Sequence, residues 1–352
     1  MGEPGLAPRD LVLGRLRRGV RDLFPGYFAL VMATGIISTA VGADGSAGLS
    51  AALLVLSIIC YLVLIVVYCW RFARYRREFL ASAADSRTAF SLFTFTAASD
   101  VLGARLAADG HYPATVVLLV VAGLSWLLLC YGVPLYLMTA HGTRSALAGI
   151  NGSWFLWVVG TQSIAVALAS LASPVDHWIA TLAVMLWTVG VLLYLIIATL
   201  VLGGLLHFPV QPASLTPAYW VFMGATAISV LAGGKVLGLP ADPVLAAVRP
   251  VLSGLSVILW AFGTWLIPLL IGLGVWRHLI RRVPLRYDPG LWSMVFPLGM
   301  YCVASETLGS ALHIHWQETL GHDGTWVAFA VWAAVFAAML GFLLAAARPR
   351  AK

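Results

Sequence analysis

The sequence predicts an all-helical integral membrane protein, and its composition and hydropathy establish this class. Of its 352 residues, 61% are hydrophobic and only 10% are charged, and the mean hydropathy is +0.94. A soluble domain carries about 25% charged residues. Fourteen acidic and 21 basic residues are too few to coat a globule of 37.6 kDa. The composition therefore excludes a cytosolic enzyme, a nucleic-acid-binding domain and a secreted disulfide scaffold.

Apolar runs separated by Pro, Gly or charged residues predict ten membrane-spanning helices, since about 20 apolar residues cross a bilayer. The predicted spans are 24–42, 49–69, 89–106, 114–138, 151–172, 177–205, 216–236, 244–275, 290–312 and 324–346. They form five consecutive helical hairpins. The chain accordingly divides into a basic interfacial segment at 1–23, a transport domain at 24–346 and a tail at 347–352.

The segment before the first span predicts an amphipathic helix that lies on the membrane surface. Its leucines and valines fall on one side of a helix, and arginines occupy the rest. Such a helix binds an anionic leaflet. The arginines are Arg9, Arg15, Arg17, Arg18 and Arg21.

Basic residues are divided unequally between the two sides of the predicted spans. If both termini lie on one side, that side carries 18 of the 21 Lys and Arg residues. Only Arg105, Lys235 and Arg249 remain for the other side and the membrane. Because positively charged loops stay in the cytoplasm, we expect both termini there. Composition suggests a bacterial genome, hence an inner (plasma) membrane, and the net charge of +7 reflects orientation rather than nucleic-acid binding.

The odd-numbered spans share aromatic residues at the cytoplasmic end and small or hydroxyl residues at mid-depth. Such residues can simply allow close helix packing. Alternatively, the odd spans line a path while the even spans face lipid. Repetition in all five hairpins favours a quasi-fivefold bundle around a central pore. The candidate pore-lining residues are Thr34, Gly35, Gly160, Thr161, Gly224 and Gly299.

Two segments, FPGYFALVMATGIIS at 24–38 and WSMVFPLGM at 292–300, together with the repeated hairpin, resemble the tellurite-resistance/C4-dicarboxylate transporter family. That family includes bacterial tellurite-resistance anion channels, the plant slow anion channel, and fungal malate and sulfite transporters. The resemblance extends from about residue 22 to 345. It implies a pore lined by the odd helices, a homotrimer with one pore per subunit, and transport of small inorganic or organic anions.

The resemblance also implies that a phenylalanine on the ninth span blocks the pore, and Phe296 matches its position. Pro297 removes a backbone hydrogen bond and kinks the helix, which can direct Phe296 toward the axis. A ring in a narrow pore forms a dry constriction. The other interpretation of Phe296 is ordinary packing. Phe90 and Phe93 on the third span are candidates for a second aromatic layer.

Four charged residues fall within the predicted spans or at their outer ends, where ionisable groups are functional candidates. Pairing of Asp100 with Lys235 or Arg105 would neutralise buried charge. Alternatively, Arg105 and Lys235 form a cationic outer vestibule that concentrates anions. Glu306 is a candidate for proton coupling.

No cofactor or metal site is expected. His313, His315 and His322 are predicted at the outer end of the ninth span and in the following loop, but side chains two apart on a helix do not converge, and a third ligand is missing. The four cysteines lack CxxC spacing.

These features favour an anion channel or uniporter. The alternative is a proton-coupled carrier of a C4-dicarboxylate such as malate, or a sulfite exporter, for which Glu306, Asp100 and Lys235 are available. The sequence contains neither an HExxH nor a GxSxG motif, so we do not expect an enzyme. The resemblance does not select the anion, and tellurite resistance would not make tellurite the natural substrate.

Overall fold

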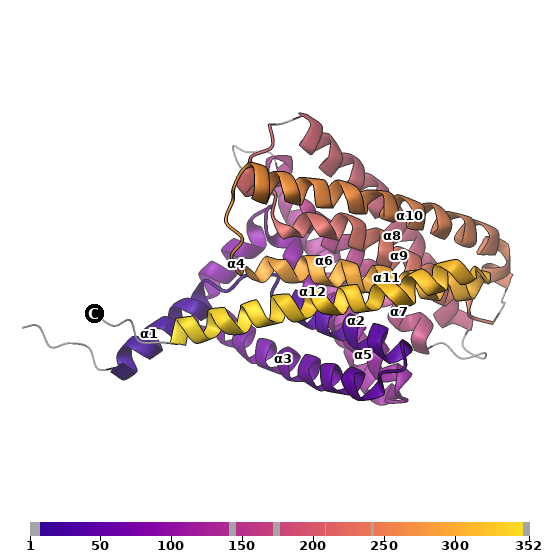
Figure 1. Ribbon diagram of the computed structural model, residues 1–352, viewed down its shortest axis with the longest axis horizontal. Coiled ribbons are helices and arrows are strands. Elements are labelled where there is room, and N and C mark those ends of the chain that lie inside the picture. The colour runs from indigo at the N-terminus through magenta and orange to yellow at the C-terminus, as the bar shows by residue number, and fades with distance from the viewer. Residues whose placement is uncertain (1–7, 141–145, 172–176, 208, 241–242, 348–352) are drawn as a thin grey trace, which may run out of the picture.

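The computed structural model describes residues 8–140, 146–171, 177–207, 209–240 and 243–347, and within these ranges the chain forms helices and no strand. The long helices run along one axis of the molecule (Figure 1). They pair in chain order as five hairpins, each with one central and one peripheral helix. The central helices are α2 (Ala29–Ala43), α5 (Phe93–Ala108), α7 (Phe155–Leu171), α9 (Val221–Leu237) and α11 (Trp292–Leu312). The peripheral helices are α3 (Ala47–Arg74), α6 (Tyr112–Thr139), α8 (His177–His207), α10 (Pro243–Val275) and α12 (His315–Ala347).

Shorter elements connect the hairpins. Four central helices are preceded by 3-10 turns, and a π-helical turn follows α10. Helices α1 (Pro8–Arg21) and α4 (Arg76–Ala84) both pack against α3. The 3-10 turns are η1 (Ala89–Leu92), η2 (Ala146–Gly149), η3 (Gly152–Trp154), η4 (Pro212–Ser214), η5 (Pro217–Trp220) and η7 (Pro289–Leu291), and the π-helical turn is η6 (Trp276–Ile280).

The central helices are enclosed by protein and the peripheral helices are not. Each central helix contacts two others, so the contacts run from α2 through α5, α7, α9 and α11 back to α2. The most apolar windows of α7 and α9 are 83% and 89% buried, against 17–28% for the peripheral helices. Peripheral side chains such as Val66, Leu128 and Ile258 are exposed. Since apolar surface of this extent is stable in lipid rather than water, the peripheral helices form the lipid-facing layer.

Seven of the described helices are long and apolar enough to cross a membrane, so the chain is a multi-pass membrane protein. These are α3, α6, α7, α8, α9, α10 and α12 with their flanking turns. The three other predicted spans correspond to α2, α5 and α11. Helix α2 is apolar but has only 15 residues. The other two carry Asp100, Arg105 and Glu306, which lower their hydropathy.

Two segments predicted as loops are helical. Residues 76–84 form α4, and α12 begins at His315 rather than near residue 324. The connection from α11 is only two residues, because His313 takes the left-handed conformation that ends a helix, with φ of 58°. His315 and His322 therefore lie on α12, where His315 contacts Glu318 at 3.1 Å.

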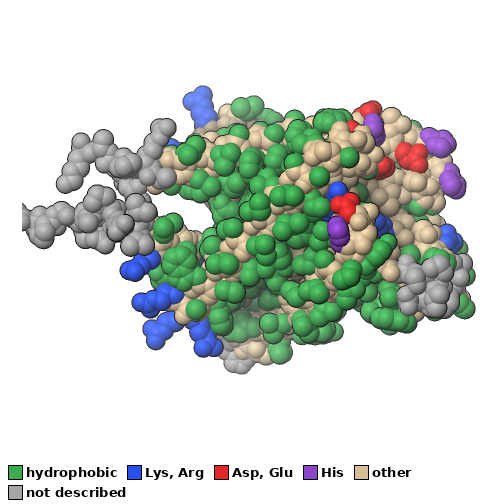
Figure 2. All heavy atoms as spheres, turned by 90° about the horizontal axis from the view of Figure 1, so that it is seen from below, with side chains coloured by type: hydrophobic (Ala, Val, Ile, Leu, Met, Phe, Trp, Pro, Cys, Tyr) green, Lys and Arg blue, Asp and Glu red, His purple; other side chains and the backbone are tan. Residues whose placement is uncertain are grey.

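The two ends of the molecule differ in charge. Figure 2 shows most of the visible Lys and Arg side chains at one end and the visible Asp, Glu and His side chains at the other. Helix α1 and the C-terminal end of α12 lie together at the basic end (Figure 1). Arg71 connects α3 to α1 and α4 at this end. It donates from Nε to the Arg21 carbonyl at 3.2 Å and from Nη2 to Ser82 Oγ at 2.9 Å. Arg144, Arg348, Arg350 and Lys352 lie outside the described residues.

Replacement of Gly152 by Ala should destabilise the fold. A Cβ at this position would lie 2.3 Å from the Ala218 carbonyl oxygen and 2.5 Å from the Tyr219 Cα, so the η3 and η5 backbones would have to separate. Overpacking of this kind costs about 1–3 kcal/mol. We expect Gly152→Ala to lower the melting temperature in detergent, whereas Gly203→Ala, which meets no atom within 4 Å, should not. Equal melting temperatures for the two variants would contradict this packing.

Candidate functional site

A cavity of about 790 Å³ lies where the five central helices begin, and we call it the N-end cavity. The turn before each central helix contributes to its wall. Asp85 and Arg87 also line it and form an ion pair of 2.8 Å, which lowers the pKa of Asp85. The wall residues from the five turns include Gly26, Ser91, Ser153, Tyr219 and Gly290.

A second cavity, of about 560 Å³, lies near the opposite ends of the same helices, and we call it the C-end cavity. All five central helices again contribute to its wall. It combines apolar, hydroxyl and ionisable side chains, and the ionisable ones belong to three different helices. One polar residue from each helix is Thr39, Asp100, Ser163, Lys235 and Glu306.

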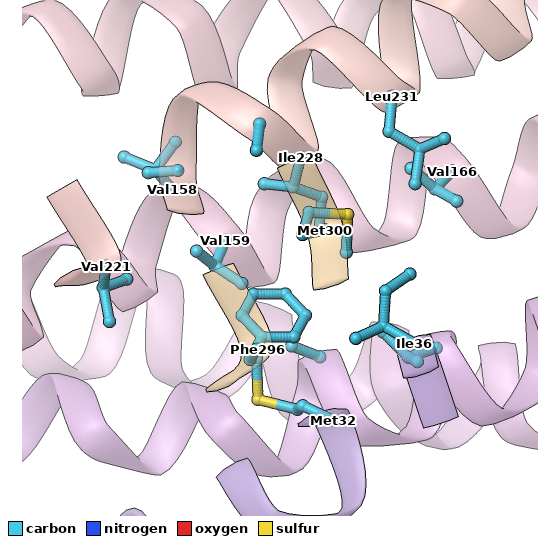
Figure 3. Close-up of a cluster of buried hydrophobic side chains, with 14 of the residues drawn as sticks. Met32, Ile36, Val158, Val159, Val166, Val221, Ile228, Leu231, Phe296 and Met300 are labelled. Carbon is cyan, nitrogen blue, oxygen red and sulfur yellow. The ribbon is translucent and has the colours of Figure 1, made fainter. Parts of the chain in front are cut away.

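An apolar layer lies between the two cavities, and Phe296 of α11 is part of it. Ser293 lines the N-end cavity and Met300 lines the C-end cavity. Phe296 is three residues after the first and four before the second, so the three side chains share one helix face. The Phe296 ring is 1% exposed. Figure 3 shows it among Met32 of α2, Val159 of α7 and Met300.

The predicted pore-lining glycines lie at contacts between neighbouring central helices. A Cβ at Gly160 would lie 2.6 Å from Phe93 Cδ1, and one at Gly224 would lie 2.7 Å from Pro297 Cγ. A Cβ at Gly35 would meet Val101 of α5 at 2.9 Å, and one at Gly299 would meet Ile37 of α2 at 2.8 Å. Small residues of this kind let helices approach closely in membranes.

Thr34 and Thr161 face the peripheral helices. Thr34 Oγ1 accepts a hydrogen bond from Trp332 Nε1 of α12 at 3.1 Å. Thr161 Oγ1 accepts one from Trp126 Nε1 of α6 at 2.9 Å. Of the six residues predicted to line a path, none is among the described residues around the two cavities.

Phe90 and Phe93 pack against α7 and the turn before it. The Phe90 ring lies 4.7 Å from that of Trp154 and 5.4 Å from that of Trp157. Phe93 covers Gly160. Both phenylalanines are buried, and neither is among the described residues that line the cavities.

The four charged residues divide into one that stabilises helix contacts and three that line the C-end cavity. Arg105 donates to Asp109 Oδ1 at 2.6 Å, to Ser38 Oγ at 3.2 Å and to Ser50 Oγ at 2.9 Å. It thereby joins α5 to α2 and α3. Asp100, Lys235 and Glu306 converge on the C-end cavity from α5, α9 and α11.

The predicted pairing of Asp100 with Lys235 or Arg105 is wrong. Asp100 is 1% exposed, and its Oδ2 accepts a hydrogen bond from Ser163 Oγ at 2.7 Å. Its Oδ1 has no hydrogen-bond partner among the described residues. Lys235 likewise has no ion-pair partner in the described part of the chain. The vestibule interpretation thus retains Lys235 but not Arg105.

Sequence reasoning missed the partners of these residues. Ser163 is one of several hydroxyls in its span, and only the register between α5 and α7 selects it as the partner of Asp100. Met32 and Met300, which flank Phe296, carry no sequence signal beyond apolarity. Asp288 accepts from the Gly290 amide at 2.7 Å, and its position directly before ProGly was a usable turn signal.

Five apolar hairpins with a cavity at each end of the same central helices have the architecture of a membrane transport protein. The chain belongs to the voltage-dependent anion channel family, whose profile matches residues 22–340. Members of this family carry small anions across membranes. The resemblance based on residues 24–38 and 292–300 is confirmed.

Individual relatives are similar over different lengths. An uncharacterized membrane protein of Mycobacterium tuberculosis is 49% identical over 153 residues, which cover 44% of this chain and 78% of that protein. An uncharacterized transporter of Methanocaldococcus jannaschii is 21% identical, covering 89% of this chain and 92% of the relative. A sulfite efflux pump of Arthroderma otae is 24% identical, covering 90% of each.

Replacement of Arg105 by Gln should destabilise the protein, because it removes a charged donor from Asp109 and two buried hydroxyls. Hydrogen bonds to charged groups contribute about 1.5–3 kcal/mol. We expect a lower melting temperature for Arg105→Gln in detergent. The matched variant Arg87→Gln should melt as wild type, since Arg87 is 73% exposed and such surface pairs contribute little. A larger loss for Arg87→Gln would overturn the structural role of Arg105.

Proposed function

We propose that this chain is a channel or uniporter that conducts small anions through a pore along the axis of its central helices. The observation that carries the proposal is the pair of cavities, which share walls from the same five helices and are separated by an apolar layer. Phe296 closes the pore at that layer, with Pro297 directing the ring. In this proposal, movement of the Phe296 ring opens the layer between the two cavities.

The electrostatics of the N-end cavity support an anion as the permeating species. Helix N-termini carry partial positive charge, and five of them surround this cavity. Among the described residues that line it, the charged side chains are Arg87, which is paired with Asp85, and Asp288, which accepts a hydrogen bond from the Gly290 amide and offsets part of the positive charge of the helix N-termini. An anion is therefore attracted without being held tightly, and conduction requires that bound ions leave easily.

The surrounding architecture is part of the same proposal. We assign the transport domain to 24–346, as ten spans in five hairpins of a quasi-fivefold bundle. The closed series of contacts among the central helices supports this assignment. The concentration of Arg at one end supports cytoplasmic termini in a plasma membrane. A homotrimer, with one pore per subunit, completes the proposal, and lipid covers the remaining peripheral surface.

The second candidate function is a proton-coupled carrier of a C4-dicarboxylate, or a sulfite exporter. The observation that favours it is the convergence of Lys235 and Glu306 on one cavity, which provides an anchoring cation and a titratable carboxyl group. The similarity to a sulfite efflux pump over 90% of the chain agrees with export of a small oxyanion. Tellurite remains one of several anions to be tested.

Replacement of Phe296 by Ala should increase anion current, because it removes the ring that separates the cavities. Chloride and nitrate currents through purified protein in planar bilayers would measure this increase. Phe90→Ala is the matched control, since Phe90 is equally buried but packs against Trp154 and Trp157. Unchanged current in a folded Phe296→Ala protein would remove Phe296 as the gate. An increase in Phe90→Ala would instead indicate a second aromatic layer.

Replacement of Glu306 by Gln separates the two candidate functions. If the protein is a coupled carrier, Glu306→Gln should abolish malate or sulfite flux driven by a pH gradient in proteoliposomes while chloride flux persists. The neutral amide keeps the shape of the side chain but cannot carry a proton. Equal flux for variant and wild type at every pH gradient would rule out coupling through Glu306.

A further inference from the structure

Two residues that line the C-end cavity have no partner of opposite charge in the described part of the chain, the buried carboxyl group of Asp100 and the ammonium group of Lys235. We propose that Lys235 and Asp100 form a binding site for a small oxyanion, in which Asp100 is protonated and acts as a hydrogen-bond donor. The inference rests on the proposed function insofar as anions reach this cavity. It goes beyond the proposed function because it assigns the bound anion to two particular side chains.

The surroundings of Asp100 do not stabilise its charged form. Ser163 Oγ lies 2.7 Å from Asp100 Oδ2 and 2.9 Å from the Gly160 carbonyl oxygen, and its single proton can be given to only one of them. Oδ1 has no partner among the described residues. An enclosed carboxylate with so little compensation is costly, whereas the neutral acid is not. As the acid, Asp100 presents an O–H group to the cavity that it lines.

The charged and titratable groups near Asp100 leave Lys235 as the cation for an anion in this cavity. On α5 itself, Arg105 is occupied by Asp109 and two serines. Helix α3 contributes Tyr61, whose hydroxyl bonds to Ser99. Helices α2, α6 and α7 contribute the hydroxyls of Thr39, Thr115 and Ser163. Asp44, at the end of α2, pairs with His322 of α12, and both act electrostatically on Glu306. Lys235 and Glu306 lie on the cavity wall opposite α5.

The chemistry of the site favours an oxyanion. An ammonium group offers three donors and a strong charge, and a carboxylic acid offers one further donor. Several oxygen acceptors on one small ion can use both at once. If Asp100 loses its proton, two carboxyl groups repel the anion, so binding should weaken as the pH rises above the range in which Asp100 is protonated.

The test uses nitrate, which does not itself titrate near neutral pH, and the full chain purified in detergent. The apparent dissociation constant is obtained from the rise in melting temperature with nitrate concentration, at constant ionic strength with gluconate. We expect the affinity of wild type for nitrate to fall as the pH is raised stepwise from pH 5, with the fall marking the loss of the Asp100 proton. Lys235→Met should weaken binding at pH 6 by about tenfold or more, since a charge-assisted hydrogen bond is lost.

Two further variants test the role assigned to Asp100. Asp100→Asn keeps a neutral donor, so its affinity for nitrate should fall less with rising pH than that of wild type, and Glu306, which lines the same cavity, is the carboxyl group that still titrates. Glu318→Gln removes a carboxylate of the same end that does not line the cavity, and it should behave as wild type. Unchanged affinity in Lys235→Met, or a fall in affinity with pH in Asp100→Asn as large as that in wild type, would overturn the site. If Phe296→Ala still increased current, the proposed function would survive that result.

Discussion

The enclosure of the central helices by the peripheral helices is the constraint on which the rest of the structure depends. Apolar side chains are stable in contact with lipid, whereas carboxyl groups and water-accessible cavities must be enclosed by protein. Because α3, α6, α8, α10 and α12 supply the apolar surface, the central helices are free to carry residues that lipid would reject. Asp100 and Glu306 persist at depth for this reason. For the same reason, the central helices α5 and α11 are less apolar than α6 and α12, the peripheral helices of their hairpins.

The bounds of the lipid-facing helices could be predicted from the sequence, because a helix surrounded by lipid needs a long apolar run. The predicted span 177–205 corresponds to His177–His207, and 244–275 to Pro243–Val275. The hydropathy pattern does not reveal where a helix continues past its apolar run into polar residues. Helix α12 starts at His315, with Glu318 and Asp323 in its first turns, and a hydropathy pattern assigns such residues to a loop. Helix boundaries in water therefore depend on caps and contacts that hydropathy does not detect.

The site was only partly predictable from the sequence. Of the four charged residues that depth singled out, Asp100, Lys235 and Glu306 line one cavity and Arg105 does not, and none of the six small residues predicted to line a path is among the described residues of a cavity wall. Pairing depends on the rotation and register of neighbouring helices, and Asp100 faces Ser163 rather than a cation. The glycines show the same difference. A mid-depth Gly160 fits a pore wall or a helix contact equally well in sequence, and only the position of Phe93 distinguishes them.

The two cavities differ in electrostatic character, and this difference bears on how long an anion stays in each. Helix N-termini surround the N-end cavity, whereas helix C-termini, which carry partial negative charge, surround the C-end cavity along with Asp100 and Glu306. In the proposed pathway, the helix N-termini therefore attract an anion to the first cavity, where Asp85 and Asp288 limit how tightly it is held. In the second cavity, an anion is repelled unless Lys235 and protonated carboxyl groups compensate. If the proposed site is correct, protonation of the C-end cavity sets how long the anion stays, so the same side chains would determine whether release is free or depends on protons.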